Sequence, residues 1–208
     1  MANSVVQLWN IALARVGITI RVESETERTS QALACALVYP MIRDKVLSSA
    51  PWPFATQAQS LQLTGTAPDH WDYQYAYPND CLEVRGVYPE IPSGLAADAL
   101  REWMRVYRVP FEVMAGDNDD TVICTDQEDA VILYTKRVTN VGRFSAHFDN
   151  CIAWAMAAEI AIPLAKGIDY AKNAGQQYQL ALNEAFAKAM NETQPGEHPE
   201  SEFVRARY

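Results

Sequence analysis

The spacing of apolar residues changes twice along the chain, from a helical period to the shorter period of β-strands and back again. Asn3 or Ser4 is suited to cap a first helix, and Gly17 is a residue type favoured just past a helix end. The apolar residues between them recur at helical spacing, namely Val5, Leu8, Trp9, Ala12 and Leu13. The sequence therefore predicts a first helix that ends at Gly17.

A second helix is predicted to begin at Ser24, because Ser24-Glu25-Thr26-Glu27 has the S-x-x-E form of a capping box. Its apolar face is predicted to contain Ala32, Cys35, Ala36, Tyr39, Ile42 and Val46. Pro40 lies inside this pattern, and a proline both lacks the N–H that a helix needs and collides with the carbonyl four residues back. We therefore expect a kink at Pro40, or a break into two helices near Tyr39.

The middle of the chain, from Pro51 onward, is rich in aromatic and β-branched residues in short segments separated by Gly, Pro, Asp and Asn. The predicted strands are 56–63, 71–77, 82–88, 103–109, 111–114, 121–125 and 130–138. Between the third and the fourth, residues 95–102 are predicted to form a short helix capped by Ser93.

The helical period returns at Ser145, and residues 145–165 are alanine-rich and nearly all apolar, which is typical of a helix buried on most sides. Gly167 is predicted to end this helix, and a last helix begins at about Asp169. Its apolar stripe contains Tyr170, Ala174, Tyr178, Ala181, Leu182, Ala185 and Ala189.

The chain after Met190 loses this period. The stretch NETQPGEHPESE is polar, turn-forming and acidic, so we expect it to be disordered in a monomer. The residues that follow combine two aromatic and two basic side chains with no acidic one: Phe203, Val204, Arg205, Ala206, Arg207 and Tyr208. This composition is typical of a peptide that folds onto a partner.

The order of helices, strands and helices predicts an α+β fold. We expect an antiparallel helical bundle from both chain ends, residues 1–50 and 144–190, with an inserted antiparallel β domain at 51–143. Residues 191–208 are expected to form a flexible, extended C-terminal arm.

The net charge of the 208-residue chain is −9, which repels a phosphate backbone and argues against tight, sequence-specific DNA binding. The four cysteines, Cys35, Cys81, Cys124 and Cys151, show no CxxC spacing, so we expect reduced thiols in the core of a cytosolic protein. The apolar stretch at 151–165 is shorter than the roughly 20 residues of a membrane span, so no membrane anchor is expected.

Candidate metal sites are sparse. His147, Asp149 and Cys151 are close in sequence, but His147 and Cys151 share a helix face as only two ligands, so a helix-start histidine is the preferred interpretation. The stretch GDNDD at 116–120 offers carboxylates for calcium, yet it lacks the spacing of an EF-hand loop, and the same residues suit a hairpin turn. A metal-dependent hydrolase that combines the two segments is kept as an alternative.

No catalytic motif for a nucleophile, a zinc protease or a phosphate-binding loop occurs. Glu25 and Glu27 might serve as acid and base, but carboxylates in the first turn of a helix are explained by the helix dipole. We therefore expect no enzyme, no catalytic residue, no metal and no cofactor.

Four aromatic residues, Trp71, Tyr73, Tyr75 and Tyr77, alternate strictly and should share one face of a strand. They are predicted to pack on a neighbouring surface in this chain or in the next one, which makes them candidates for an oligomer or partner interface. A carbohydrate- or base-stacking surface is the alternative.

Several segments resemble the tail tubular protein A family of short-tailed phages, over roughly residues 8–190. They are Ala12-Leu13-Ala14-Arg15-Val16-Gly17, Arg43-Asp44-Lys45-Val46-Leu47, Pro51-Trp52-Pro53-Phe54-Ala55, Tyr75-Ala76-Tyr77-Pro78-Asn79-Asp80-Cys81 and Val131-Ile132-Leu133-Tyr134-Thr135-Lys136-Arg137-Val138, followed by Phe144, Phe148 and Ala157-Ala158-Glu159-Ile160-Ala161. Pro40 departs from the family, which usually has an acidic residue at that position.

The resemblance implies a head-to-tail adaptor, in which a helical bundle with a β domain assembles as a dodecameric ring. Such a ring binds the portal protein on one side and the tail nozzle, tail tubular protein B, on the other, and its channel carries phage DNA outward without specific binding. The protein is then expected in the virion tail, and in the host cytoplasm during assembly. Phe203, Val204, Arg205, Arg207 and Tyr208 are the expected portal-docking residues, and Trp71 to Tyr77 the expected oligomer or nozzle contacts.

Overall fold

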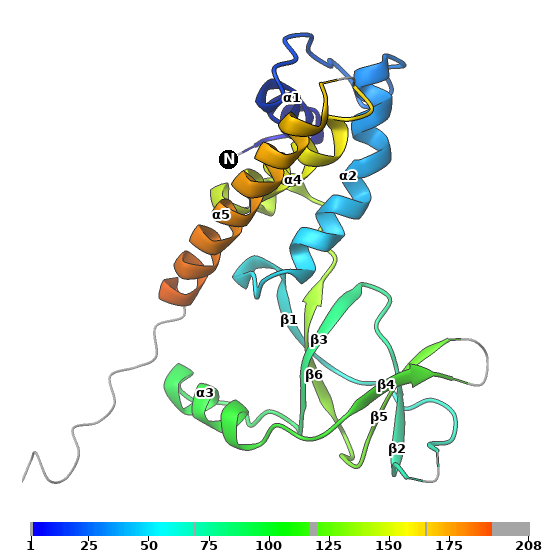
Figure 1. Ribbon diagram of the computed structural model, residues 1–208. Helices are drawn as coiled ribbons and strands as arrows, with labels where there is room; N and C mark the ends of the chain where they lie inside the picture. Colours follow the sequence, from blue (N-terminus) through cyan, green and yellow to red (C-terminus); the bar gives the residue numbers. More distant parts are fainter. Residues whose placement is uncertain (1, 69, 117–119, 165, 193–208) are drawn as a thin grey trace, which may run out of the picture. The chain divides into compact units, whose positions relative to one another are not determined.

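A computed structural model describes residues 2–68, 70–116, 120–164 and 166–192. It combines helices with small antiparallel sheets, which confirms the α+β class (Figure 1). The helices are α1 (Val5–Arg15), α2 (Ser30–Ser48), α3 (Ala97–Val106), α4 (Ala146–Ile160) and α5 (Ile168–Glu192). The strands are β1 (Thr56–Ser60), β2 (Tyr73–Ala76), β3 (Cys81–Tyr88), β4 (Glu112–Ala115), β5 (Thr121–Thr125) and β6 (Val131–Lys136).

The chain divides into two compact units. The first, which we call the helical unit, comprises Met1–Gln57, Asp80–Glu83 and Tyr134–Ala189. The second, which we call the β unit, includes Ala58–Asn79 and Val84–Leu133. Residues 51–57, 80–83 and 134–143, which lie in the predicted β domain, therefore belong to the helical unit.

Helix α1 confirms the first predicted helix. The Ser4 hydroxyl accepts a hydrogen bond from the Gln7 N–H at 3.2 Å, which satisfies one of the N–H groups left open at a helix start. After the helix, Gly17 takes a left-handed backbone with φ of 72°, where a side chain would be strained. The apolar stripe of α1 is buried through Leu8, Trp9, Ala12 and Leu13.

The predicted start of the second helix is wrong, because α2 begins at Ser30 with Thr29 as its cap. The Thr29 hydroxyl oxygen accepts from the Ala32 N–H, while Glu27, the expected capping-box acid, accepts from the Glu23 N–H at 2.8 Å and from the Thr29 hydroxyl at 2.9 Å. These bonds hold a local turn in place of a helix and lower the pKa of Glu27. The helix-dipole explanation of Glu25 and Glu27 is therefore also wrong.

The predicted break near Tyr39 is wrong too, since α2 continues through Pro40 as one helix of 19 residues. A proline at this position leaves the Ala36 carbonyl without its helical donor. Ala36 and Pro40 are both exposed, so water can hydrate that carbonyl.

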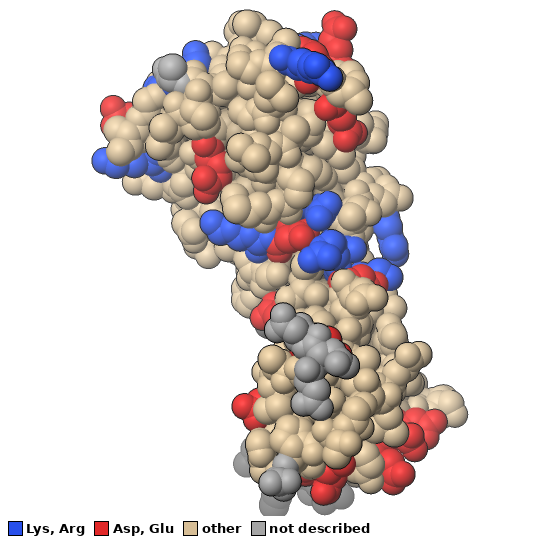
Figure 2. Space-filling view, turned by 90° about the vertical axis from the view of Figure 1, so that its right-hand side faces the viewer, with Lys and Arg blue, Asp and Glu red and all other residues tan. Residues whose placement is uncertain are grey.

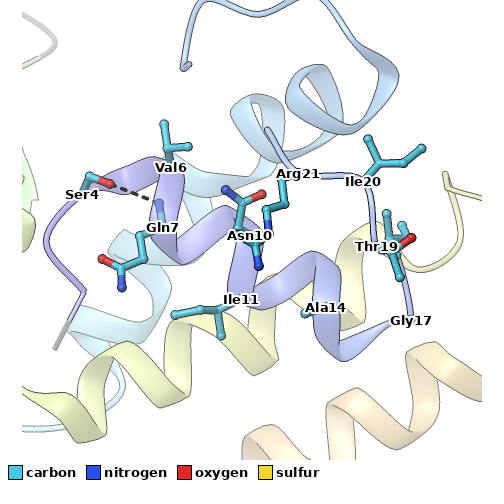
Figure 3. Close-up of a pocket in the computed structure, with 11 residues that line it drawn as sticks. Ser4, Val6, Gln7, Asn10, Ile11, Ala14, Gly17, Thr19, Ile20 and Arg21 are labelled. Atoms are coloured by element: carbon cyan, nitrogen blue, oxygen red, sulfur yellow. Dashed lines mark hydrogen bonds between the residues drawn. The ribbon is translucent and has the colours of Figure 1, made fainter. Parts of the chain in front are cut away.

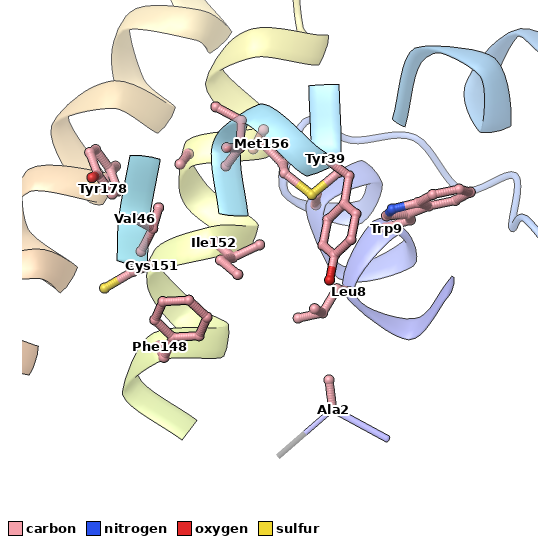
Figure 4. Packing of buried hydrophobic residues seen from close by; sticks show 14 of the residues in the cluster. Ala2, Leu8, Trp9, Tyr39, Val46, Phe148, Cys151, Ile152, Met156 and Tyr178 are labelled. Carbon is pink, nitrogen blue, oxygen red and sulfur yellow. The ribbon is translucent and has the colours of Figure 1, made fainter. Parts of the chain in front are cut away.

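Helix α4 forms the centre of the helical unit, and α1, α2 and α5 lie around it (Figures 1 and 4). Its cap is Ser145, and nine of its 15 residues are buried, as expected for a helix covered on most sides. Helix α5 adds small residues and one tyrosine to the same core: Ala174, Tyr178, Ala181 and Ala185.

An aromatic cluster explains why residues 51–57 belong to the helical unit. The Phe148 ring of α4 lies 4.9 Å from the Trp52 ring, 5.1 Å from the Phe54 ring and 4.6 Å from the Phe144 ring, measured between centroids. All three contacts are edge-on, a favourable geometry for aromatic pairs.

The strands form two three-stranded sheets, with the orders β1-β6-β3 and β2-β5-β4. In the second sheet, β5 is central and antiparallel to both neighbours, with Ile123 opposite Tyr75 on β2 and Val113 on β4. The β4–β5 pairing confirms the predicted hairpin, and the Gly116 N–H donates to the Asp120 carbonyl at 2.7 Å. Residues 117–119 of that turn lie outside the described residues.

The predicted strand at 103–109 is wrong, because α3 runs through Val106. Within the helix, Arg105 pairs with Glu102 at 2.6 Å, and the Trp103 ring stacks on the Tyr107 ring just beyond the helix end at 5.3 Å. Contacts three and four residues apart are typical of a helix and are not made along an extended strand. The predicted Ser93 cap is also wrong, since the N-cap is Ala96, without a side-chain hydrogen bond.

Candidate functional site

The aromatic residues predicted as interface contacts have different environments. Tyr75 is only 1% exposed, and its hydroxyl donates to the Gln127 carbonyl at 2.8 Å. A side chain held inside the β unit cannot contact another chain, so the assignment of Tyr75 as an interface residue is wrong. Burial also raises the pKa of Tyr75.

Trp71, Tyr73 and Tyr77 are each partly exposed. The Tyr73 ring lies 6.4 Å from the Tyr75 ring, so these two side chains do share a face. The Trp71 indole N–H donates to the Glu112 carboxylate at 3.2 Å, which ties it to β4. The three residues keep exposed surface that is available to a partner. Tyr75 is buried and is not part of that surface.

An open groove of about 730 Å³ lies between α1 and the segment that follows it (Figure 3). The segment is held by Asn10, whose side-chain amide donates to the Val22 carbonyl and accepts from the Val22 N–H, both at 2.8 Å. The lining residues are Ser4, Val6, Gln7, Asn10, Ile11, Ala14, Gly17, Ile18, Thr19, Ile20 and Arg21. Arg21 is the one charged residue among them, and the Ser4 hydroxyl is engaged as the helix cap, so the groove offers no acid–base pair for catalysis.

Asp149 and Cys151, which were considered as metal ligands, have other surroundings in the structure. Asp149 is buried, and its Oδ2 accepts a hydrogen bond from the Ala2 N–H at 2.6 Å. Cys151 is fully buried, and burial raises the pKa of its thiol to about 12. In the described ranges, no group of three or more His, Cys, Asp or Glu residues could hold a metal ion. All four cysteines are buried, which confirms that they fill the core.

Arg15 is a partly buried cation beside Cys151. Its guanidinium donates to the backbone and side-chain oxygens of Asn150 at 2.9 and 2.6 Å and lies 4.2 Å from the centre of the Trp154 ring. Burial lowers the pKa of Arg15 to about 10, against a smaller opposing effect of the Cys151 thiol. The residue ties α1 to α4 and serves packing.

An ion-pair cluster joins three distant parts of the helical unit. Asp44 on α2 accepts from Arg43 at 2.8 Å and from Arg137 at 2.9 Å, while Asp80 pairs with Lys136 at 3.1 Å. The Arg137 N–H also donates to the Asp80 carbonyl at 2.7 Å, so Arg137 links both acids. On the face drawn in Figure 2, several basic and acidic side chains lie next to one another.

The environment of Asp80 favours its charged form. Burial alone would raise the pKa of this carboxyl, but hydrogen bonds from Lys136 and Tyr134, together with the Lys136 charge, lower it below its usual value. The Tyr134 hydroxyl donates to Asp80 at 3.0 Å, and burial and this bond raise the tyrosine pKa to about 12. The Asp80 carboxyl is therefore ionised at neutral pH.

Two helices of the helical unit expose apolar side chains. Leu33, Leu37 and Met41 of α2 are 57%, 81% and 57% exposed. On α5, the exposed apolar residues are Ile168, Tyr170, Leu180 and Phe186. Within the described residues, these two helices carry seven of the 14 large apolar side chains that are exposed.

The sequence interpretation missed the α2 surface. The signal was present, because no charged residue occurs between Ser30 and Ile42, and a helix with one solvated face normally carries some. The expected portal-docking residues, Phe203, Val204, Arg205, Arg207 and Tyr208, lie outside the described residues.

Comparisons with known proteins assign no relative, since neither a family model nor a curated protein matches the chain. Among the described residues, no helix is long and apolar enough to cross a membrane.

Proposed function

We propose that this chain is a head-to-tail adaptor of a short-tailed phage, of the tail tubular protein A kind, and not an enzyme. In this role it forms a ring, in the family's manner a dodecamer, that joins the portal protein to the tail nozzle and lines the channel for DNA ejection. The observation that carries the proposal is the ion-pair cluster, because its charged residues come from three of the segments that resemble the family.

Asp44, Asp80 and Arg137 lie in three different resembling segments: the Arg137 guanidinium donates to the Asp44 carboxylate, and the Arg137 backbone N–H donates to the Asp80 backbone carbonyl. A chance similarity of short motifs gives no reason for their charged residues to meet in space. A shared fold does give one, because an unpaired charge that is partly buried is costly. The cluster therefore supports a common architecture for this chain and the family.

The finer fold that we propose is an antiparallel helical bundle built from both chain ends, with the β unit as an insert. Such a bundle provides long helix surfaces for contacts between neighbouring copies. The net charge of −9 fits a channel wall, because an acidic surface repels DNA and lets it pass without specific binding.

The partner contacts follow from composition and exposure. We assign portal docking to Phe203, Val204, Arg205, Arg207 and Tyr208, whose aromatic and basic side chains suit coupled folding and binding. Trp71, Tyr73 and Tyr77 are assigned to contacts with the nozzle or with a neighbouring copy, since each retains exposed surface.

The proposal is tested by mixing the purified full chain with the portal protein encoded in the same genome and imaging the mixture by electron microscopy. We expect a ring of this protein on one end of the portal. A portal that stays bare at saturating protein concentration contradicts the adaptor role.

A second experiment tests the docking residues. The double variant Arg205→Glu and Arg207→Glu should lose portal binding while its melting temperature stays unchanged, because the two charges act only on the partner. The matched control reverses Lys45 and Lys172, two exposed charges on α2 and α5, and should keep binding. Binding retained by the arginine variant would show that the C-terminal residues do not dock.

A further inference from the structure

We infer that the core of the helical unit contains a binding site for one buried water molecule, which bridges the Trp9 indole N–H, the Tyr39 hydroxyl and the Asp149 carboxylate. These three side chains come from α1, α2 and α4, so the water joins three helices. The inference concerns the interior of a single chain and does not depend on the proposed function.

The first argument is that three deeply buried polar atoms lack a protein partner. Trp9, Tyr39 and Asp149 are 3%, 6% and 7% exposed. Among the described residues, no atom forms a hydrogen bond with Trp9 Nε1, with the Tyr39 hydroxyl or with Asp149 Oδ1. A buried polar group without a hydrogen bond is costly, and nearly all such groups in folded proteins bond to the protein or to ordered water. Three of them in one core therefore indicate a shared small polar partner.

The second argument is that these groups lie in the same region of the core. The Trp9 and Tyr39 rings meet edge to face, with their centroids 6.4 Å apart. The hydroxyl end of Tyr39 points toward the side on which Leu8 and Ala2 lie (Figure 4). The Ala2 N–H donates to Asp149 Oδ2 at 2.6 Å, so the carboxylate lies on that side as well. Burial raises the pKa of Tyr39 to about 12, and the charge of Asp149 is among the smaller causes of that rise.

The third argument is hydrogen-bond chemistry, which selects water as the occupant. The Trp9 indole N–H can only donate, and the carboxylate oxygen Asp149 Oδ1 can only accept. A bridging occupant must therefore accept from Trp9 and donate to Asp149. A metal ion or an ammonium ion has no lone pair for the indole N–H, and a simple anion has no proton for the carboxylate. Water does both, and the Tyr39 hydroxyl supplies a third bond, which makes the about three bonds that are typical of a buried water.

The bridge has a structural consequence for the helical unit. A fully satisfied buried polar network favours one arrangement of the surrounding elements, because a displacement leaves a polar group without its partner. The water therefore fixes the position of α1 against α2 and α4. Asp149 extends the network to Ala2, whose N–H it binds ahead of α1.

Nuclear magnetic resonance tests for the water through the indole protons of the full-length chain. We expect a cross-peak between the Trp9 indole proton and a long-lived water. The matched control within the same protein is Trp52, which is 2% exposed and whose indole N–H donates directly to the Val46 carbonyl at 2.7 Å, so it should show no such peak. Trp9→Phe removes one indole signal and thereby assigns it. A Trp9 proton without a water cross-peak, or an equal peak at Trp52, overturns the inference.

Tyr39→Phe separates a bound water from proton exchange, because a hydroxyl proton that exchanges with solvent could produce the same cross-peak. In this variant the peak should persist, since Trp9 and Asp149 still offer a donor and an acceptor to the water. The matched control is Tyr75→Phe, which removes a hydroxyl bonded to the Gln127 carbonyl in the β unit and should also keep the peak. Circular dichroism checks that both variants fold. Loss of the peak in Tyr39→Phe alone assigns it to the hydroxyl proton and overturns the inference.

A crystal structure of the full chain gives the second test. We expect one peak of electron density within hydrogen-bond distance of Trp9 Nε1, the Tyr39 hydroxyl and Asp149 Oδ1. A direct hydrogen bond between Tyr39 and Asp149, with no density between them, overturns the inference. Neither measurement requires the portal protein, so failure of the adaptor role leaves the water site standing.

Discussion

The helical unit and the β unit differ in how completely their elements are covered. In the helical unit, α4 buries nine of its 15 residues, and one continuous core joins α1, α2, α4 and α5. In the second sheet, four of the five residues of β5 are buried, but no residue of β4 is. The helical unit therefore depends on many mutually supporting contacts, whereas this sheet depends on one central strand.

This difference also predicts which side chains contribute to the stability of the fold and which contribute to contacts with other chains. Removing buried apolar surface from the helical unit should cost the most, because its core is dense and cannot relax easily. The exposed apolar residues of α2 and α5 should contribute little to the monomer and more to assembly. The following substitutions measure this contrast, from the largest expected effect to the smallest.

Phe148→Ala should destabilise the protein by about 3–5 kcal/mol, because the substitution leaves a cavity among three aromatic rings. Phe148 is 0% exposed. The loss is measured by urea denaturation followed by circular dichroism. The control is Phe186→Ala on the exposed face of α5, with an expected loss under about 1 kcal/mol. Equal losses in the two variants would contradict the assignment of the core.

Ile123→Ala should destabilise the β unit by about 2–4 kcal/mol, since the side chain is fully buried on the central strand. Hydrogen exchange followed by mass spectrometry should report lost protection in β2, β4 and β5 with α4 unaffected. The control is Val113→Ala, at the exposed partner position of Ile123 on β4. Equal deprotection of α4 would mean that the two units unfold together.

Asp149→Asn should stabilise the helical unit by about 1 kcal/mol at neutral pH, because a buried charge is replaced by a neutral amide. Burial raises the pKa of Asp149, and the hydrogen bond from Ala2 opposes the rise only in part. The folded protein therefore binds this proton more tightly than the unfolded chain, so the favourable contribution holds at low pH and is lost as pH rises through the folded pKa.

The melting temperatures of the Asp149 variant and the wild type, measured from pH 4 to pH 8, check the sign. The difference in favour of asparagine should grow with pH. A constant difference across this range would show that the carboxyl does not titrate differently on folding.

Asp80→Asn should have the smallest effect, under about 1 kcal/mol, because the Lys136 pair is partly exposed. The pKa of Asp80 is lowered in the fold, so its stabilising contribution is present above the unfolded pKa and is lost as pH falls through the folded pKa. Thermal melts should therefore separate the variant from the wild type at neutral pH and merge in acid. A larger difference in acid than at neutral pH would contradict the assigned ion pair.

Predictions from the sequence succeeded where local signals decide the structure. Ser4 caps α1 because its hydroxyl reaches an N–H three residues on, and β5 has the predicted bounds because its β-branched run lies beside a turn. Prediction failed where a distant or competing contact decides. Glu27 looks like a capping-box acid in the sequence, but its carboxylate closes a turn, and Trp103, a strand-favouring residue, lies in α3.

The predictions about the candidate site also succeeded only where local signals decide the structure. The alternation of Tyr73 and Tyr75 correctly placed both rings on one face, yet the alternation says nothing of which ring the rest of the unit covers. Exposure is decided by packing: Tyr75, predicted at an interface, is buried, and Ala36, predicted on the apolar face of the second helix, is exposed.

By itself, the sequence determined the first helix with its Ser4 cap, most of the strands, the burial of the cysteines and the α+β class, because these depend on neighbouring residues and on hydrophobic period. Only the tertiary structure decided the start of α2 at Ser30, its passage through Pro40, and the meeting of Asp44 and Asp80 through Arg137. These features depend on contacts with distant side chains and on exposure to solvent. A local sequence pattern contains no information about either.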